Sequence, residues 1–260
     1  MYYLSINFLN MSSSERYLYY FVSDVHLGLG AYDAPAREER FVKFLRGVPP
    51  EIKALYLLGD IFDYWFEYKY VVPKGFTRVL GELSKLADSG VELYFFRGNH
   101  DMWTFGYLEK EIGLKILKEP AVVEIGQKKF CLAHGDELTG AEPSHLMLKK
   151  LFRSKVLQIL LASIHPRWTF PIASKWSTTR KMTNYSLLEF KGKEEPLYKY
   201  ASEFEKKEEV DYFIYGHIHT PGDAITPSGA GFYILGAWLY GCEYLCYDSR
   251  NDKITWMSGY

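Results

Sequence analysis

The sequence predicts one α/β domain over residues 1–260, with β-sheets inside and helices outside. Short apolar runs alternate with helical patterns through the first hundred residues, and the C-terminal third contains further strand-like runs. The chain has 260 residues, of which 48% are hydrophobic and 24% charged, so it can build a substantial core as a single globular domain.

The first three predicted strands each lead into a short polar turn. The predicted strands are residues 16–23, 53–58 and 91–96, and the turns after them read DVHLG, GDIFD and RGNHD. The segments between them, residues 36–46 and 76–88, have helical patterns, and a glycine ends the second. This alternation is typical of parallel strands joined by helices.

The second half of the chain repeats the same kind of turn. Residues 121–124 and 129–133 predict a hairpin that delivers HGD, and after a long helical region residues 212–215 predict a strand that delivers GHIH. The runs at residues 231–235, 243–247 and 253–257 predict a β meander.

The five polar turns indicate a binuclear metal site. Side chains that follow strands converge on one edge of a sheet, and Asp, Asn and His suit Mn²⁺, Fe or Zn²⁺. Two cations about 3.5–4 Å apart can clamp both the attacking and the leaving oxygen of a phosphoryl transfer. Asp60, which follows a strand and a glycine, is suited to bridge them. One such turn alone is more often a capped loop, but five in one chain favour a metal site.

The ordered motifs DVH, GDIFD, GNHD, HGD and GHIH resemble those of the calcineurin-like metallophosphoesterase superfamily and span most of the chain. The resemblance implies a four-layered αββα sandwich and two divalent ions. The sequence does not fix which metal is bound; we expect Mn²⁺, with Fe or Zn²⁺ as alternatives. It assigns one metal to Asp24, His26, Asp60 and His219, and the other to Asp60, Asn99, His134 and His217. It also places His100 over the substrate phosphate as an acid or electrostatic stabiliser, held by Asp101.

A basic and apolar block follows HGD. From Pro143 to Leu188 there is no Asp or Glu, and basic residues are interspersed with apolar clusters. Such a helix can lie on an anionic membrane or beside a lipid phosphate, or it can be a core helix with solvated lysines. Candidate phosphate or headgroup contacts are Lys69, Arg97, Lys149, Lys150 and Arg153.

An aromatic loop runs on from GDIFD. Its residue Trp65 is a candidate substrate contact, because aromatic rings beside a metal site can stack a nucleobase or line an apolar groove. The alternative is that the loop's rings pack against one another. Nearby carboxylates, Asp63, Glu67 and Asp136, are either supports for the ligands or plain surface charges.

The stretches GDIFDYWFEYKYVVPKG and RGNHDMWTFGYLEKEIG resemble the lipid A branch of the superfamily, in its Bacteroidetes-type form. The resemblance implies hydrolysis of UDP-2,3-diacylglucosamine to UMP and 2,3-diacylglucosamine 1-phosphate by a peripheral enzyme at the inner face of the cytoplasmic membrane. A helical insertion, about residues 143–185, would be a lid that clasps the acyl chains. His100 departs from the proteobacterial form, which has GNRD; either residue can stabilise the leaving group.

Other functions remain open. A phosphoesterase of this fold could act on soluble diesters, nucleotides or phosphoproteins. A nuclease is disfavoured because the net charge is −1, so we expect no nucleic-acid partner. A scaffold that has lost catalysis would be expected to lack a ligand, and none is missing.

The sequence predicts a cytoplasmic protein with no transmembrane span, no signal peptide and reduced thiols at its three cysteines. Met11 is an alternative start to Met1.

Overall fold

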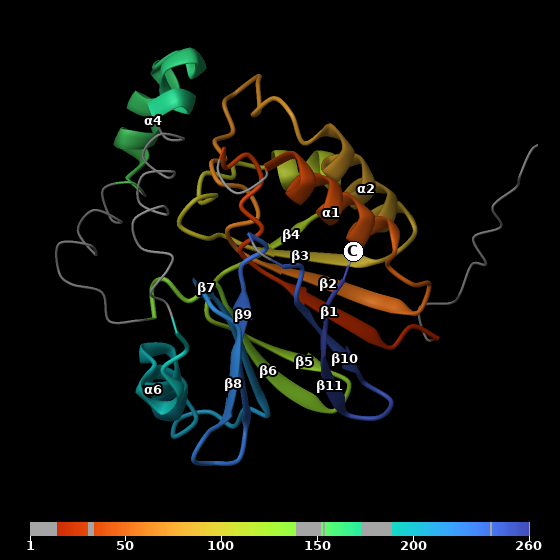
Figure 1. Ribbon diagram of the computed structural model, residues 1–260. Coiled ribbons are helices and arrows are strands. Elements are labelled where there is room, and N and C mark those ends of the chain that lie inside the picture. Colours follow the sequence, from red (N-terminus) through yellow and green to blue (C-terminus); the bar gives the residue numbers. More distant parts are fainter. Residues whose placement is uncertain are drawn as a thin grey trace, which may run out of the picture.

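The computed structural model describes residues 15–30, 34–138, 152, 154–172, 189–239 and 241–259. Two β-sheets pack against each other, and helices cover their outer faces (Figure 1). The layer order is helix, sheet, sheet, helix, which confirms the predicted αββα sandwich.

The six-stranded sheet holds the first three motif-bearing strands. Its order is β11-β10-β1-β2-β3-β4. The parallel strands are β1 (Leu18–Val22), β2 (Ile52–Leu58), β3 (Glu92–Phe96) and β4 (Lys115–Leu117). Strands β10 (Tyr244–Asp248) and β11 (Lys253–Met257) extend this sheet in antiparallel pairing. Between the parallel strands lie α1 (Ala34–Arg46), α2 (Thr77–Asp88) and the short helix η1 (Leu108–Ile112).

The five-stranded sheet holds the other two motifs, in the order β5-β6-β7-β9-β8. Its parallel strands are β6 (Lys128–Ala133), β7 (Tyr212–His219) and β9 (Gly231–Gly236). Its antiparallel strands are β5 (Ala121–Ile125) and β8 (Gly222–Ile225). Helices η3 (Gly192–Glu194) and α6 (Pro196–Phe204) precede β7.

The predicted C-terminal meander is wrong in one strand. β10 and β11 form the expected hairpin, but β9 pairs in parallel with β7 in the other sheet. The sequence pattern identifies β9 as a strand and carries no information about its partner. The chain therefore crosses from one sheet to the other between β9 and β10.

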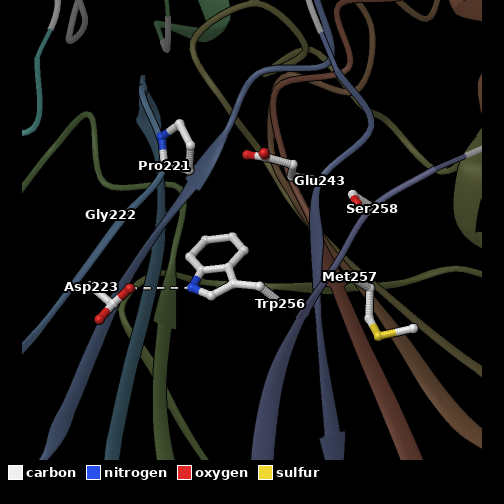
Figure 2. A pocket seen from close by; sticks show the side chains of 7 residues that line it. All are labelled: Pro221, Gly222, Asp223, Glu243, Trp256, Met257 and Ser258. Atoms are coloured by element: carbon white, nitrogen blue, oxygen red, sulfur yellow. Dashed lines mark hydrogen bonds between the residues drawn. The ribbon is translucent and has the colours of Figure 1, made fainter.

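The two sheets also approach each other beside β8 and β11. There the indole Nε1 of Trp256 donates to Asp223 Oδ1 at 3.3 Å, next to a cavity of about 270 Å³ (Figure 2). Its lining is Pro221, Gly222, Asp223, Glu243, Trp256, Met257 and Ser258. None of these residues is a predicted metal ligand.

Strand β2 shows how alternation builds the layers. Leu55 and Leu57 pack toward α1 and α2, whereas Tyr56 and Leu58 pack between the sheets. All four are buried, as expected for a parallel strand that is covered on both faces.

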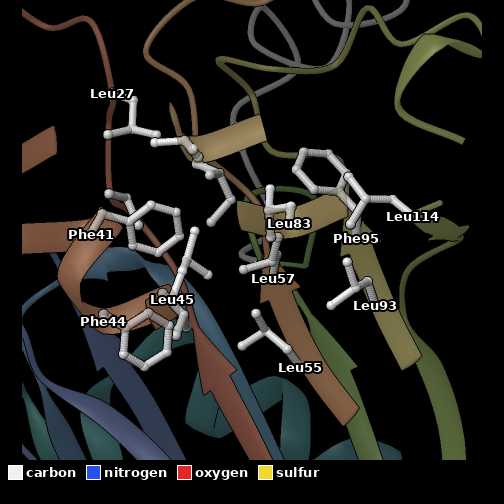
Figure 3. Packing of buried hydrophobic residues seen from close by; sticks show 14 of the residues in the cluster. Leu27, Phe41, Phe44, Leu45, Leu55, Leu57, Leu83, Leu93, Phe95 and Leu114 are labelled. Atoms are coloured by element: carbon white, nitrogen blue, oxygen red, sulfur yellow. The ribbon is translucent and has the colours of Figure 1, made fainter. Parts of the chain in front are cut away.

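The outer helices cover each sheet with apolar side chains. In Figure 3, Phe41, Phe44 and Leu45 of α1 and Leu83 of α2 meet the leucines of β2. On the other sheet, α6 buries side chains that include Leu197. Burial of each such Leu or Phe contributes about 1.5–3 kcal/mol of transfer free energy. This packing stabilises the strands whose ends carry the motifs.

Part of the predicted insertion is described. Helix α4 (Lys155–Ser163) lies within residues 143–185 and has no buried residue. In Figure 1 it stands beside the main body. Within the described parts of the chain, no helix combines the length and the apolar character needed to cross a membrane.

Candidate metal centre

The predicted ligands follow strands of both sheets. Asp24 and His26 follow β1, Asp60 follows β2, Asn99 follows β3, and His134 follows β6, while His217 and His219 belong to the end of β7. Backbone hydrogen bonds tie these turns together, from Asp24 N to Gly59 O at 3.1 Å and from Gly216 N to His134 O at 3.0 Å. The carboxyl ends of the parallel strands thus form one polar edge.

One group of donor atoms matches the set predicted for the first metal. Atoms of Asp24, His26, Asp60 and His219 all lie within 4.8 Å of one another. His219 Nε2 is 3.1 Å from both Asp24 Oδ1 and His26 Nε2, and His26 Nε2 is 3.8 Å from Asp60 Oδ2. Donors about 2.0–2.2 Å from one ion are separated by such distances. This group therefore fits a divalent cation.

The second predicted group also lies next to Asp60. His134 Nε2 is 3.6 Å from Asp60 Oδ2 and 3.4 Å from Asn99 Oδ1, and the rings of His134 and His217 are 5.2 Å apart. The Asp60 carboxylate faces both groups, which is the position a bridging ligand needs.

Five of the seven predicted ligands have left-handed backbone conformations. Their φ angles are +54° at Asp24, +50° at His26, +53° at Asp60, +70° at His217 and +69° at His219. Each costs about 1–3 kcal/mol for a residue with a Cβ, and such residues cluster at functional sites. The strained backbone conformations therefore direct these side chains toward the candidate metal centre.

Two motif glycines are required by close approach. A Cβ on Gly98 would lie 2.2 Å from Asp60 Oδ1, and one on Gly216 would lie 2.0 Å from Ser23 Oγ and 2.7 Å from Asp24 Oδ2. Only glycine lets the backbone pass this close to the ligands.

Buried acidic and basic side chains shift one another's pKa values in this site. Burial would raise the pKa of Asp60, but the imidazoles of His100, His134 and His26 outweigh it and lower that pKa. Burial would lower the pKa of His134, but Asp60 and Asp24 raise it to about 10. A buried cluster of this kind is suited to exchange protons for divalent cations.

Asp101 has a different role from the predicted one. Its carboxylate accepts hydrogen bonds from the backbone amides of Gly98, Ile61 and Phe62 at 2.8, 2.8 and 3.2 Å, and of Asp60 at 3.2 Å. It therefore joins the GDIFD and GNHD turns to each other. Burial, with Asp60 nearby, raises its pKa to about 7.

Asp63 takes the position beside His100 that was predicted for Asp101. His100 Nδ1 lies 2.8 Å from Asp63 O and 3.5 Å from Asp63 Oδ1, and His100 Nε2 is 3.9 Å from Asp60 Oδ2. The prediction that Asp101 holds His100 is corrected accordingly. Both aspartates lie in motifs, and the sequence does not indicate which one reaches the ring.

Two supporting residues were missed. Ser23 Oγ donates to Asp24 Oδ2, and Glu119 Oε2 accepts from the amides of His134 and Gly135 at 2.7 and 3.2 Å. Ser23 directly precedes DVH, which is a usable signal. Glu119 lies fifteen residues before His134, and nothing in the sequence connects the two.

The predicted substrate contacts separate into three groups. Trp65 is fully buried, with its ring 4.3 Å from that of Phe62, so its burial contradicts a role in touching substrate. Arg97 directs Nε to Thr104 Oγ1 at 2.6 Å, and Lys69 is exposed. Lys149, Lys150 and Arg153 lie outside the described residues.

A two-sheet α/β fold with Asp, Asn and His at converging strand ends defines a metal-dependent phosphoesterase. The sequence model described as calcineurin-like phosphoesterase matches residues 18–221, and the chain belongs to this family.

Several curated relatives have the name UDP-2,3-diacylglucosamine hydrolase. The protein of that name from Porphyromonas gingivalis (strain ATCC BAA-308 / W83) is 40% identical over 247 residues, covering 89% of this chain and 94% of its own. The relative from Serratia proteamaculans (strain 568) is 26% identical, covering 84% and 90%, and that from Neisseria gonorrhoeae (strain ATCC 700825 / FA 1090) is 30% identical, covering 63% and 67%.

Proposed function

We propose that this protein hydrolyses the pyrophosphate of UDP-2,3-diacylglucosamine to UMP and 2,3-diacylglucosamine 1-phosphate, as a step of lipid A biosynthesis. The observation that supports this most is the 40% identity to a UDP-2,3-diacylglucosamine hydrolase across nearly its whole length. The clustered donor atoms of Asp24, His26, Asp60 and His219 supply the chemistry such a reaction needs.

The side chains divide the work in this proposal. The two ligand groups would each hold one divalent ion and share Asp60; when bound, the ions supply positive charge and activate water near neutral pH. His100, which is partly exposed, would face the phosphate, where a protonated imidazole would offset charge on the leaving oxygen. Asp63 fixes its ring through Nδ1. Asp101 maintains the spacing of the two turns.

Mn²⁺ is our choice among the divalent ions. The predicted donor set is nitrogen and oxygen only, without thiolate, which suits Mn²⁺ and also admits Fe or Zn²⁺. Loading the metal-free protein with each ion, followed by activity and metal analysis, tests this. Higher activity with Zn²⁺ than with Mn²⁺ at equal occupancy would reverse the choice.

We also propose that the protein is cytoplasmic and binds peripherally to the anionic inner surface of the membrane, with no nucleic-acid partner. Helix α4 exposes Val156, Ile159 and Leu160, with Trp168 exposed beyond it, and residues 154–172 contain no Asp or Glu. Apolar side chains beside Lys155 and Arg167 suit an anionic lipid surface.

Vesicle sedimentation tests the membrane proposal. Binding to vesicles with 30% anionic lipid should exceed binding to neutral vesicles, and Ile159→Ser should weaken it several-fold. Equal, weak binding to both kinds of vesicle would contradict it.

The substrate proposal is tested with Mn²⁺-loaded enzyme, UDP-2,3-diacylglucosamine in detergent, and ¹⁸O water. We expect UMP that carries the ¹⁸O, acylated sugar phosphate, and little turnover of UDP-glucose. Cleavage of a soluble phosphodiester alone would leave the metal centre standing and overturn the lipid substrate.

A further inference from the structure

Helix α4 is attached to the core through the residues before and after it. Before α4, the ring of Phe152 meets the edge of Trp103, with centroids 5.8 Å apart. The indole Nε1 of Trp103 also donates to Phe152 O at 3.1 Å. This fixes the chain at the N-terminal side of the helix.

The attachment after α4 consists of a hydrogen bond and a ring contact. The Tyr68 hydroxyl and Thr169 Oγ1 are 2.8 Å apart, and Phe170 meets Tyr64 edge-to-face at 4.9 Å. Both partners belong to the aromatic loop that follows GDIFD. Phe152, Thr169 and Phe170 therefore dock on one surface, which we call the aromatic platform (residues 64–68 and 103–105).

The aromatic platform is rigid because a buried carboxylate holds it. Glu67 accepts hydrogen bonds from the amides of Phe105, Tyr107 and Leu108 and from the indole of Trp65. A buried carboxylate with several N–H donors is a strong local anchor. The platform can thus serve as a fixed base for α4.

The same platform adjoins His100, which lies beside the candidate metal centre. Trp65 N donates to His100 O at 3.3 Å, and Tyr64 directly follows Asp63, whose backbone and side chain contact the His100 ring. The attachment of α4 is therefore one residue away from the group that orients His100.

Between its two attachments α4 leaves apolar side chains uncovered. Val156, Ile159 and Leu160 are 68%, 67% and 58% exposed. Covering such surface with hydrocarbon is favourable, and the acyl chains of a lipid substrate can supply far more of that cover than a small phosphoester can.

We propose that Tyr68 and Thr169 form a clasp that determines substrate selectivity. The clasp holds α4 beside the aromatic platform and so favours lipid-linked over water-soluble phosphoesters. This inference rests on the proposed lipid function. Tyr68 and Thr169 act through the position of α4 and need not touch the reacting atoms.

Tyr68→Phe and Thr169→Val test the clasp, because each removes one hydroxyl. The Tyr68 ring packs 4.6 Å from that of Phe66, so the phenylalanine keeps the packing. Tyr70→Phe is the matched control, since Tyr70 is 84% exposed. The measurements are kcat/KM for UDP-2,3-diacylglucosamine in detergent and for bis(p-nitrophenyl) phosphate, with hydrogen exchange of the α4 amides.

Each single variant should lose about three- to tenfold in kcat/KM for the lipid substrate, the size of one hydrogen bond. Thr169 Oγ1 also donates to Pro166 O at 3.4 Å, so the double variant should lose no more than Thr169→Val alone, which already lacks the Tyr68 contact. Turnover of the soluble diester should stay unchanged, and α4 amides should exchange faster.

Two results would overturn the clasp. One is unchanged lipid turnover in all variants of an enzyme whose wild type is active on lipid. The other is a parallel loss on both substrates, which would mean that the substitutions disturb the metal centre. A wild type inactive on lipid would instead overturn the proposed substrate, and the selectivity role with it.

Discussion

The Asp60 carboxylate lies where the two predicted ligand groups meet. Its Oδ2 is 3.8 Å from His26 Nε2 and 3.6 Å from His134 Nε2, while its Oδ1 accepts from His100 N at 2.9 Å. A single residue thus joins both ligand groups and the GNHD turn.

We predict that Asp60→Asn lowers kcat by at least about 10²–10³-fold, since the amide removes the charge that both metals would share. The bound metal, measured by mass spectrometry, should fall below two ions per chain. Asp88→Asn, an exposed change at the end of α2, is the control and should retain activity and metal. Near-normal turnover by Asp60→Asn would remove Asp60 from the bridging position.

Cys131 illustrates how burial controls a side chain outside the site. It is fully buried, 3.5 Å from the Tyr215 hydroxyl, and burial raises the pKa of its thiol to about 12. Since the thiolate is the reactive form, the thiol should be almost unreactive at pH 8.

We therefore expect iodoacetamide at pH 8 to leave Cys131 unmodified in the native protein and to label it in urea. Labelling of the native protein should rise with pH, because the fraction of thiolate rises. Peptide mass spectrometry gives the measurement. Equal labelling of native and unfolded protein at pH 8 would show that the thiol is accessible.

At the scale of elements, the motif turns depend on backbones that pass close to ligands. Gly98 begins the GNHD turn at the end of β3, and a side chain there would overlap Asp60. Gly81, within α2, has nothing from outside its own helix backbone within 4 Å of where a Cβ would be. The two glycines are therefore a matched pair.

Gly98→Ala should abolish activity, because a Cβ 2.2 Å from Asp60 Oδ1 must displace the Asp60 carboxylate. Gly81→Ala should keep activity and stabilise the protein by about 0.5–1 kcal/mol, because alanine is the better helix former. Urea unfolding and metal-dependent turnover report both effects. An active Gly98→Ala enzyme would show that the turn can relax around the methyl group.

Strands that have a long apolar run or end in a polar motif could be predicted from the sequence. Very short strands, and the sheet to which a strand belongs, could not. Strands β1, β2 and β3 combine a buried apolar run with a polar turn, and they lie where expected. Strands β4 and β8 have only three and four residues, too few to show a period. The sheet to which β9 belongs depends on partners distant in the chain.

The same contrast holds in the candidate site. The placement of ligands after strands follows from local patterns, because strand ends share an edge. Contacts such as Glu119 with the His134 amide, or Asp63 with His100, depend on how separate turns meet in space. Sequence identifies the residue types available for these supports and leaves their partners undetermined.

At the scale of the molecule, the candidate metal ligands come from both sheets. Asp24 and Asp60 come from the six-stranded sheet, while His134, His217 and His219 come from the five-stranded sheet. Metal binding by these residues would therefore link the two halves of the sandwich, and the unfolded chain cannot reproduce this arrangement of donors.

Removing the metals should consequently destabilise the whole fold. At a metal concentration 100 times Kd, binding to the native state alone adds about 2.7 kcal/mol, which corresponds to about 5–10 °C in Tm for a chain of this size. We expect the Mn²⁺-loaded protein to melt that much higher than the chelated protein, by calorimetry, and to regain its Tm when Mn²⁺ is restored. His219→Ala should show a smaller shift because it removes one of the donors that the five-stranded sheet supplies. Identical Tm values with and without metal would mean that the cations do not connect the two sheets energetically, and the stability of the sandwich would then rest on its apolar layers alone.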